Sequence, residues 1–125
     1  MTENAFSARN WPMEIRYSKE EKTLNLDFDD GAQFSLSAEL LRVESPSAEV
    51  QGHGPSQKKI IAGRRHVGIM SMEPVGNYAI RINFDDMHNT GIYSWQYLYE
   101  LGQKQEATWL DYLAALEANG LSRDP

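Results

Sequence analysis

Hydrophobic residues change their spacing once along this chain, and that change is the feature that most constrains its fold. In residues 11–36 and 66–84 they recur mainly at every second position, which is typical of β-strands with one buried face. In residues 94–120 they recur every three to four positions, as in helices. Strands that precede helices favour an α+β domain. We therefore expect an antiparallel sheet of about five strands with two C-terminal helices packed on one face.

The first part of the predicted sheet is a three-stranded antiparallel meander. Apolar and polar residues alternate in residues 11–17, 24–28 and 34–36. Between the last two segments, Asp29, Asp30 and Gly31 form a hairpin-turn sequence, because glycine tolerates positive φ.

The second part of the predicted sheet is a hairpin. Residues 66–75 carry apolar side chains on both faces, which predicts a central strand. Gly76 and Asn77 then turn the chain into residues 78–84, where the alternation is the clearest in the sequence.

Three residues of the N-cap type begin the predicted helices, because their hydroxyl groups can accept a hydrogen bond from an amide of the first turn. The first helix is short, over residues 38–42, and the two C-terminal helices each end at a glycine, the residue type expected there. The predicted N-caps are Ser37, Ser94 and Thr108, and the predicted helix-ending glycines are Gly102 and Gly120.

We expect a single domain at residues 11–118. Residues 1–10 are polar and are predicted to be a disordered tail, and residues 119–125 are predicted to be a loose C-terminal tail. Residues 44–57 are rich in Ser, Pro and Gly, which predicts a long loop. Loops of this length are often functional.

The charge and the absence of cysteine exclude several classes of protein. Eighteen acidic against twelve basic residues give a net charge of −6, which disfavours binding to nucleic acid. The basic side chains at residues 58, 59, 64 and 65 are therefore predicted to be solvated surface. No cysteine is present, and no stretch approaches the ~20 apolar residues of a membrane-spanning helix. We expect a cytoplasmic protein without a nucleic-acid or membrane partner.

A polar turn that runs into aromatic residues is the densest motif of the sequence. Its residues are His88, Gly91, Ile92, Tyr93, Ser94, Trp95, Tyr97 and Leu98, and weaker matches are Trp11, Pro12, Asp30, Gly31, Leu40, Leu41 and Arg42. On these residues the chain resembles the gamma-butyrobetaine hydroxylase-like N-terminal domain family, a family of unknown function, over residues 11–116. In larger relatives this domain precedes an iron and 2-oxoglutarate dependent dioxygenase barrel, or is attached to an iron-sulfur carrier ATPase. The resemblance therefore implies an accessory domain and no enzymatic activity.

The same resemblance implies a metal site that has lost its thiolates. In the hydroxylases, a Cys-Pro-Cys-x-x-Cys run and one histidine bind zinc. The resemblance places Ser45, Ser47 and Val50 on the cysteines and His88 on the histidine. Because a serine hydroxyl is a poor zinc ligand and valine offers no donor, we expect no cofactor.

A rebuilt metal site is the alternative. Imidazole and carboxylate groups both bind zinc or iron. Such a site would use His88 together with His53 and a carboxylate, either Glu44 or Glu49.

The main functional hypothesis is a non-catalytic protein-interaction module. The sequence contains no Ser-His-Asp order and no phosphate-binding loop or dinucleotide fingerprint. Helical periodicity directs several aromatic rings inward but leaves Tyr93 or Tyr97 near the surface. We predict an interaction surface that contains Asp86, His88, Tyr93 and Tyr97, and whose partner is another protein or a second copy of the chain.

Overall fold

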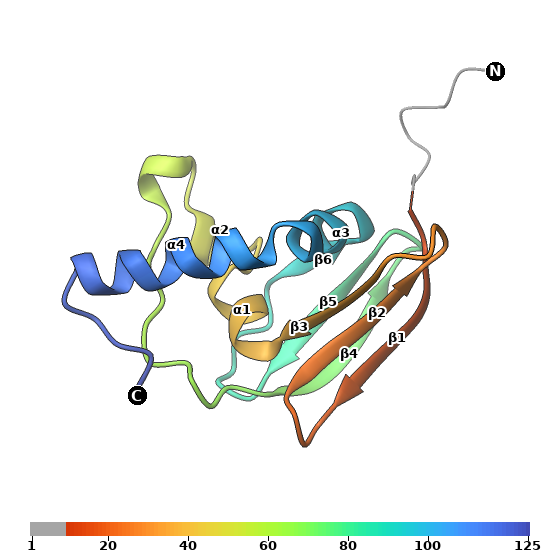
Figure 1. The fold of residues 1–125 in the computed structure, drawn as a ribbon, viewed down its shortest axis with the longest axis horizontal. Helices are drawn as coiled ribbons and strands as arrows, with labels where there is room; N and C mark the ends of the chain where they lie inside the picture. Colours follow the sequence, from red (N-terminus) through yellow and green to blue (C-terminus); the bar gives the residue numbers. More distant parts are fainter. Residues whose placement is uncertain (1–9) are drawn as a thin grey trace.

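The computed structural model describes residues 10–125 of the chain, so the predicted N-terminal tail lies, except for Asn10, outside the described residues. Figure 1 shows strands at one side and helices at the other. The strands are β1 (Pro12–Ser18), β2 (Thr23–Phe28), β3 (Gln33–Ser37), β4 (Ile69–Val75), β5 (Ala79–Phe84) and β6 (Ile92–Ser94). The helices are α1 (Ala38–Val43), α2 (Ala48–Gln51), the 3-10 turn η1 (Pro55–Gln57), α3 (Trp95–Gln103) and α4 (Gln105–Ala118).

The α+β class is confirmed, but the prediction of one sheet of about five strands is wrong. The strands form two antiparallel three-stranded sheets, in the orders β1-β2-β3 and β4-β5-β6. The additional strand is β6, whose Tyr93 lies opposite Ile80 of β5. The sequence motif hid this strand because its three residues run directly into α3. Where the two sheets approach each other, a side chain makes the contact: the Ile69 amide donates to the Tyr17 hydroxyl at 3.0 Å.

Both predicted hairpins are confirmed. In the first sheet Leu26 of β2 lies opposite Phe34 of β3, and Gly31 of the turn has φ +91°. In the second sheet Met72 of β4 lies opposite Ile82 of β5.

The prediction that residues 66–75 form a central strand is wrong, because β4 begins at Ile69 and lies at the edge of its sheet. Met70 is 70% exposed, so the apolar residues do not mark two buried faces. Pro74 suits an edge strand, since proline has no amide to donate to a further strand.

The main core lies between the two sheets and beneath α1 and α3. Its fully buried members include Leu24, Leu26 and Leu36 from the first sheet, Ile82 and Phe84 from the second, and Leu41 and Leu98 from the helices. Of the two C-terminal helices, α3 packs against β3 and β6, and α4 contributes the partly buried Trp109 to the main core. The α4 helix extends beyond the sheets (Figure 1) and forms a second cluster of buried residues with α1, in which Val43 contacts Tyr112 and Leu116.

Two of the three predicted N-caps are confirmed. The Ser37 hydroxyl accepts from the Leu40 amide at 3.0 Å, and the Ser94 hydroxyl accepts from the Tyr97 amide at 3.0 Å. Thr108 is not a cap, because α4 already begins at Gln105 and Thr108 lies inside it.

The two glycines that were predicted to end helices differ. Gly120 follows α4 with φ +66°, as predicted. Gly102 lies inside α3 and is buried, and a Cβ atom there would lie 2.3 Å from Cγ of Phe34. Its lack of a side chain therefore allows α3 to approach β3.

Two segments that were predicted to be irregular have more structure. Residues 44–57 contain α2 and η1. In the C-terminal tail, the Arg123 guanidinium donates to both carboxylate oxygens of buried Glu39, at 2.7 and 2.9 Å, and lies over the Trp109 ring. The prediction of a loose tail is therefore wrong, because a buried carboxylate requires a partner. Among the described residues, every helix is too short or too polar to cross a bilayer.

Candidate functional site

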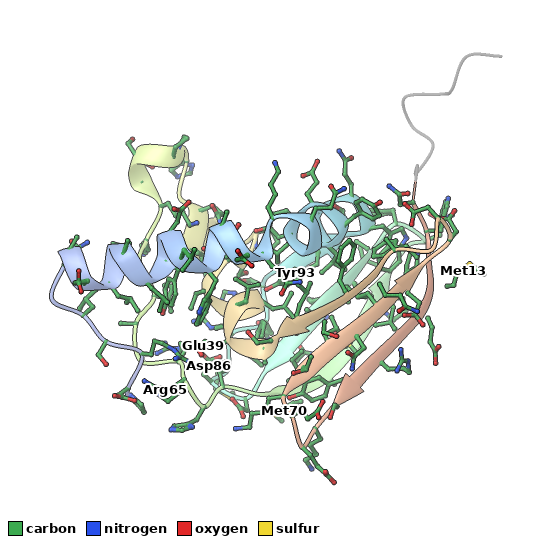
Figure 2. The ribbon with its side chains drawn as sticks, viewed as in Figure 1. Met13, Glu39, Arg65, Met70, Asp86 and Tyr93 are labelled. Carbon is green, nitrogen blue, oxygen red and sulfur yellow. The ribbon has the colours of Figure 1, made fainter. Side chains whose placement is uncertain are left out.

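The turn that follows β5, residues 85–91, packs against the segment that joins α1 to α2, and most of the predicted site residues lie at this junction. His88 of the turn and Ser45 and Ser47 of the segment are all buried. Asp86 is partly buried beside α1, on the side of the molecule away from Met13 (Figure 2).

Asp86 is held by two arginines. The Nε atoms of Arg42, from α1, and of Arg64 both lie 2.7 Å from its Oδ2, and its Oδ1 accepts from the His88 amide at 3.2 Å. Burial raises the pKa of Asp86, but the hydrogen bonds from Arg42 and the His88 amide and the charge of Arg42 outweigh it, so the pKa lies below its usual range. Asp86 is therefore ionised at neutral pH.

His88 joins a closed ring of five polar contacts, of which four are hydrogen bonds and one, between His88 and Glu49, is a contact of an imidazole with a carboxylate. Its Nε2 lies 2.9 Å from Oγ of Ser45, and its Nδ1 lies 3.2 Å from Oε1 of Glu49. Thr90 donates to the same Glu49 oxygen at 2.8 Å, and its hydroxyl lies 2.7 Å from Oγ of Ser47. The Ser47 amide donates back to Oγ of Ser45 at 3.2 Å, which closes the ring.

The neutral form of His88 fits this ring. Burial and the positive charge of Arg42 lower the pKa of His88, while the charges of Glu49 and Asp86 oppose this shift. Because Oγ of Ser45 already accepts from the Ser47 amide, its proton can be donated to Nε2 of His88. The protonated Nδ1 of His88 then faces Oε1 of Glu49 at 3.2 Å.

The Ser45, His88 and Glu49 side chains have the connectivity of a hydrolase triad, and sequence reasoning missed this grouping. A nucleophilic serine must be reachable by a substrate carbonyl. Ser45 is 0% exposed, and Gly91 packs so closely on it that a Cβ atom at Gly91 would lie 2.5 Å from its Oγ. The arrangement therefore positions segments of the chain and exposes no nucleophile.

Of the residues of the alternative metal site, the structure places Glu49 beside His88, with Oε1 3.2 Å from Nδ1, but Glu44 and His53 have other surroundings. Glu44 pairs with Lys58 at 2.7 Å, and His53 is exposed, with its backbone amide bonded to Gln57. Both ring nitrogens of His88 already have polar partners, Ser45 at Nε2 and Glu49 at Nδ1. Within residues 10–125, no three histidine or acidic side chains come together as a metal-binding group.

The two predicted surface tyrosines instead cap the C-terminal end of α1. Tyr93 is 0% exposed and donates to the carbonyl of Leu41, and burial raises its pKa. Tyr97 is partly buried and donates to the carbonyl of Glu44, and burial and the nearby carboxylates of Glu44 and Glu100 raise its pKa to about 12. The expectation that Tyr93 lies near the surface is therefore wrong.

The exposed apolar residues of this region are ones that sequence reasoning did not select. Met87 is 83% exposed and Ile92 is 47% exposed. Met87 also has φ +76°, a left-handed conformation that is uncommon for a residue other than glycine. No sequence signal indicates this conformation, because methionine has no preference for it.

The basic segment, residues 58–66, is largely neutralised by contacts within the protein. Besides the pairs of Lys58 with Glu44 and Arg64 with Asp86, Arg65 contacts Asp124 at 2.5 Å. These pairs leave little of the segment's charge for an acidic partner.

A comparison with protein families finds one that matches most of the chain. Residues 15–99 match the family described as gamma-butyrobetaine hydroxylase-like, N-terminal. Two similar proteins have NMR solution structures: one is 46% identical over 93% of this chain and 91% of that chain, with a TM-score of 0.80. The other is 43% identical over 100% of this chain and 92% of that chain, with a TM-score of 0.82.

A crystal structure is also similar, that of a protein of unknown function in the DUF971 family from Acidithiobacillus ferrooxidans. It is 38% identical over 73% of this chain and 91% of that chain, with a TM-score of 0.62. None of the curated proteins matches the chain.

Proposed function

We propose, from the premise that the chain belongs to the gamma-butyrobetaine hydroxylase-like, N-terminal family, that it is a non-catalytic module that binds a protein partner. The turn between β5 and β6, residues 85–91, would carry the binding surface, with Met87 at its centre. The comparisons name no activity, and the similar protein from Acidithiobacillus ferrooxidans is described as a protein of unknown function.

The observation that carries this proposal is the conformation of Met87. Its φ of +76° is unfavourable for a residue with a side chain, and such strain is concentrated at functional sites. The strained backbone holds an 83% exposed apolar side chain in solvent, where the side chain buries little surface and adds little to the stability of the fold. A partner with an apolar pocket would gain binding free energy by burying this side chain, because methionine is flexible and polarisable and adapts to irregular pockets.

The residues on either side of Met87 give it a fixed base. Asp86 is held by Arg42 and Arg64, and His88 is held by Ser45 and Glu49. In this proposal Asp86 and His88, which were predicted to contact the partner, position Met87, and the caps at Tyr93 and Tyr97 support the turn from within. A pre-organised turn binds more tightly because little conformational freedom is lost on association.

The test is affinity capture from cell extract with three forms of the protein: wild type, Met87→Ala and Met70→Ala. Met70 is the matched control, because it is a 70% exposed methionine that lies on β4 and outside the turn. We expect one protein to be retained by wild type and by Met70→Ala, and its recovery to fall about tenfold or more with Met87→Ala, as at an interface hot spot. Equal recovery by both variants would overturn the proposal.

A second copy of the chain is the other candidate partner. Light scattering after size exclusion distinguishes the two, since self-association through this turn would appear as a dimer of wild type and of Met70→Ala. The dimer would dissociate in Met87→Ala.

A further inference from the structure

The resemblance places a zinc site of the hydroxylases at a position that this chain fills with other side chains. The resemblance aligns Ser45, Ser47, Val50 and His88 with three cysteines and a histidine. All four residues are buried, so the chain has kept an enclosed site while its donor set has changed. This site adjoins Met87 but is tested separately, by metal content and stability and not by binding of a partner.

The residues present do not fit a zinc ion. Structural zinc needs four nitrogen, sulfur or carboxylate donors at about 2.0 to 2.3 Å. Val50 offers no donor, and the Ser45 hydroxyl lies at a hydrogen-bond distance of 2.9 Å from Nε2 of His88. His53 is exposed and Glu44 pairs with Lys58, so neither replaces a missing ligand.

With His88 neutral, one arrangement of protons fits all the contacts of the ring. The Ser45 hydroxyl then donates to Nε2 of His88, and the protonated Nδ1 faces Oε1 of Glu49 at 3.2 Å. The Ser47 hydroxyl accepts from the Glu49 amide at 3.1 Å and donates to Thr90, which donates to Glu49. The ring therefore satisfies its buried hydroxyl and imidazole groups without a metal, as buried polar groups require.

We propose that this ring, formed by Ser45, Ser47, Glu49, His88 and Thr90, takes the place of the family's zinc. It fixes α2 and the segment before it to the turn after β5 without a metal. The ring joins segments that lie about 40 residues apart, as a metal would, since Ser45 to His88 spans 43 positions and Glu49 to Thr90 spans 41. It also fixes His88, which follows Met87 directly.

The first experiment measures bound metal and its effect on stability. Untagged wild type, His88→Ala and His53→Ala are incubated with Zn²⁺ or Fe²⁺, desalted and subjected to elemental analysis, and thermal unfolding is recorded with and without EDTA. His53→Ala is the control for loss of an exposed imidazole. We expect no stoichiometric metal in any of the three and no shift of Tm by EDTA. Near-stoichiometric metal that is lost only in His88→Ala, with a Tm lowered by EDTA, would overturn the proposal.

The second experiment tests whether the ring itself stabilises the fold. Ser45→Ala and Glu49→Gln each break the ring at a different member, and both residues are linked through His88. We expect each substitution to raise the unfolding equilibrium constant about tenfold. The double variant should raise the unfolding equilibrium constant by less than the product of the two single fold-changes, since members of one network are coupled.

Ser35→Ala is the matched control, because Ser35 is an exposed serine whose hydroxyl is also bonded to a side chain, that of Asn25. It should change the unfolding constant less than about twofold. Effects of Ser45→Ala and Glu49→Gln that are equally small, or that multiply independently, would overturn the proposal.

The third experiment rebuilds the thiolates. A variant with Ser45→Cys, Ser47→Cys and Val50→Cys restores the donors that the resemblance places beside His88. Uptake of one Zn²⁺ with an EDTA-sensitive Tm supports the view that the ring occupies the position of the metal. A folded triple variant that takes up no zinc would overturn it.

Discussion

The hydroxyl of Tyr93 in β6 donates a hydrogen bond to the backbone carbonyl of Leu41 in α1, 52 positions earlier in the chain. The last carbonyls of a helix have no partner within the helix. Here a fully buried tyrosine supplies one. The contact therefore caps α1 and ties the first half of the chain to the second sheet.

Replacing this tyrosine with phenylalanine should lower the free energy of unfolding by about 1 to 3 kcal/mol, because the ring remains but the buried carbonyl of Leu41 loses its donor. Urea unfolding of Tyr93→Phe measures this loss. Tyr78→Phe is the control, since Tyr78 is 56% exposed and its change should be within about 0.5 kcal/mol. Equal stability of the two variants would contradict the role of the cap.

A methyl group at Gly102 should destabilise the fold although alanine is the better helix former. The gain in helix propensity is about 1 kcal/mol, but the new Cβ atom would lie 2.3 Å from Cγ of Phe34, so the ring and α3 must move apart. We expect Gly102→Ala to lose about 1 to 3 kcal/mol of unfolding free energy by chemical denaturation.

Gly54→Ala provides the comparison for this change. Gly54 has an extended φ of 177°, and a Cβ atom there would have no atom within 4 Å. Its stability should be unchanged or slightly raised. A neutral Gly102→Ala would show that α3 does not depend on the close approach to Phe34.

The stabilisation by Asp86 should depend on pH. Its pKa in the folded protein is lowered, mainly by Arg42, against the effect of burial, so its contribution is fully present above the unfolded pKa of about 4. The contribution is lost as the pH falls from there through the folded pKa. Wild type should therefore exceed Asp86→Asn in unfolding free energy at pH 7, by about 1 to 3 kcal/mol.

This difference should shrink when unfolding is measured near pH 3. The exposed Asp111→Asn variant should differ little from wild type at either pH. A gap between wild type and Asp86→Asn that stays constant with pH would argue against a contribution from the ionised carboxylate.

Glycine at position 87 should make the isolated protein more stable. Relief of the left-handed conformation gains about 1 to 2 kcal/mol, and the greater freedom of glycine in the unfolded chain offsets about half of this. Thermal unfolding should show a rise of about 0.5 to 1 kcal/mol for Met87→Gly. The same change in β4, Met70→Gly, should have the opposite sign, because Met70 lies in a strand. A loss of stability in Met87→Gly would remove the argument from strain.

Local patterns in the sequence were enough to predict the hairpins and two of the caps. Gly31 and Gly76 stand where a turn needs a positive φ, and Ser37 and Ser94 stand directly before helices. These features depend on a few neighbouring residues. The division into two sheets does not, because it depends on which strands meet in space.

The parts of the site that were missed depend on distant contacts. The alignment with the family selected His88, Ser45 and Ser47, but their connection through Glu49 and Thr90 requires the α2 segment to lie on the turn. Tyr93 was expected near the surface because its strand, β6, was not recognised. The conformation of Met87 follows from its two anchored neighbours, so the residue type at position 87 does not indicate it.

The contact of Gly102 with Phe34 also constrains how the family can evolve. The two positions lie on different elements, yet position 102 cannot take a side chain while the Phe34 ring is present and α3 stays against β3. A larger residue at 102 becomes acceptable only after the ring at 34 has become smaller. Among descendants of this chain the substitutions should therefore be ordered, with position 34 changing first, and the pair should vary together when many sequences are compared.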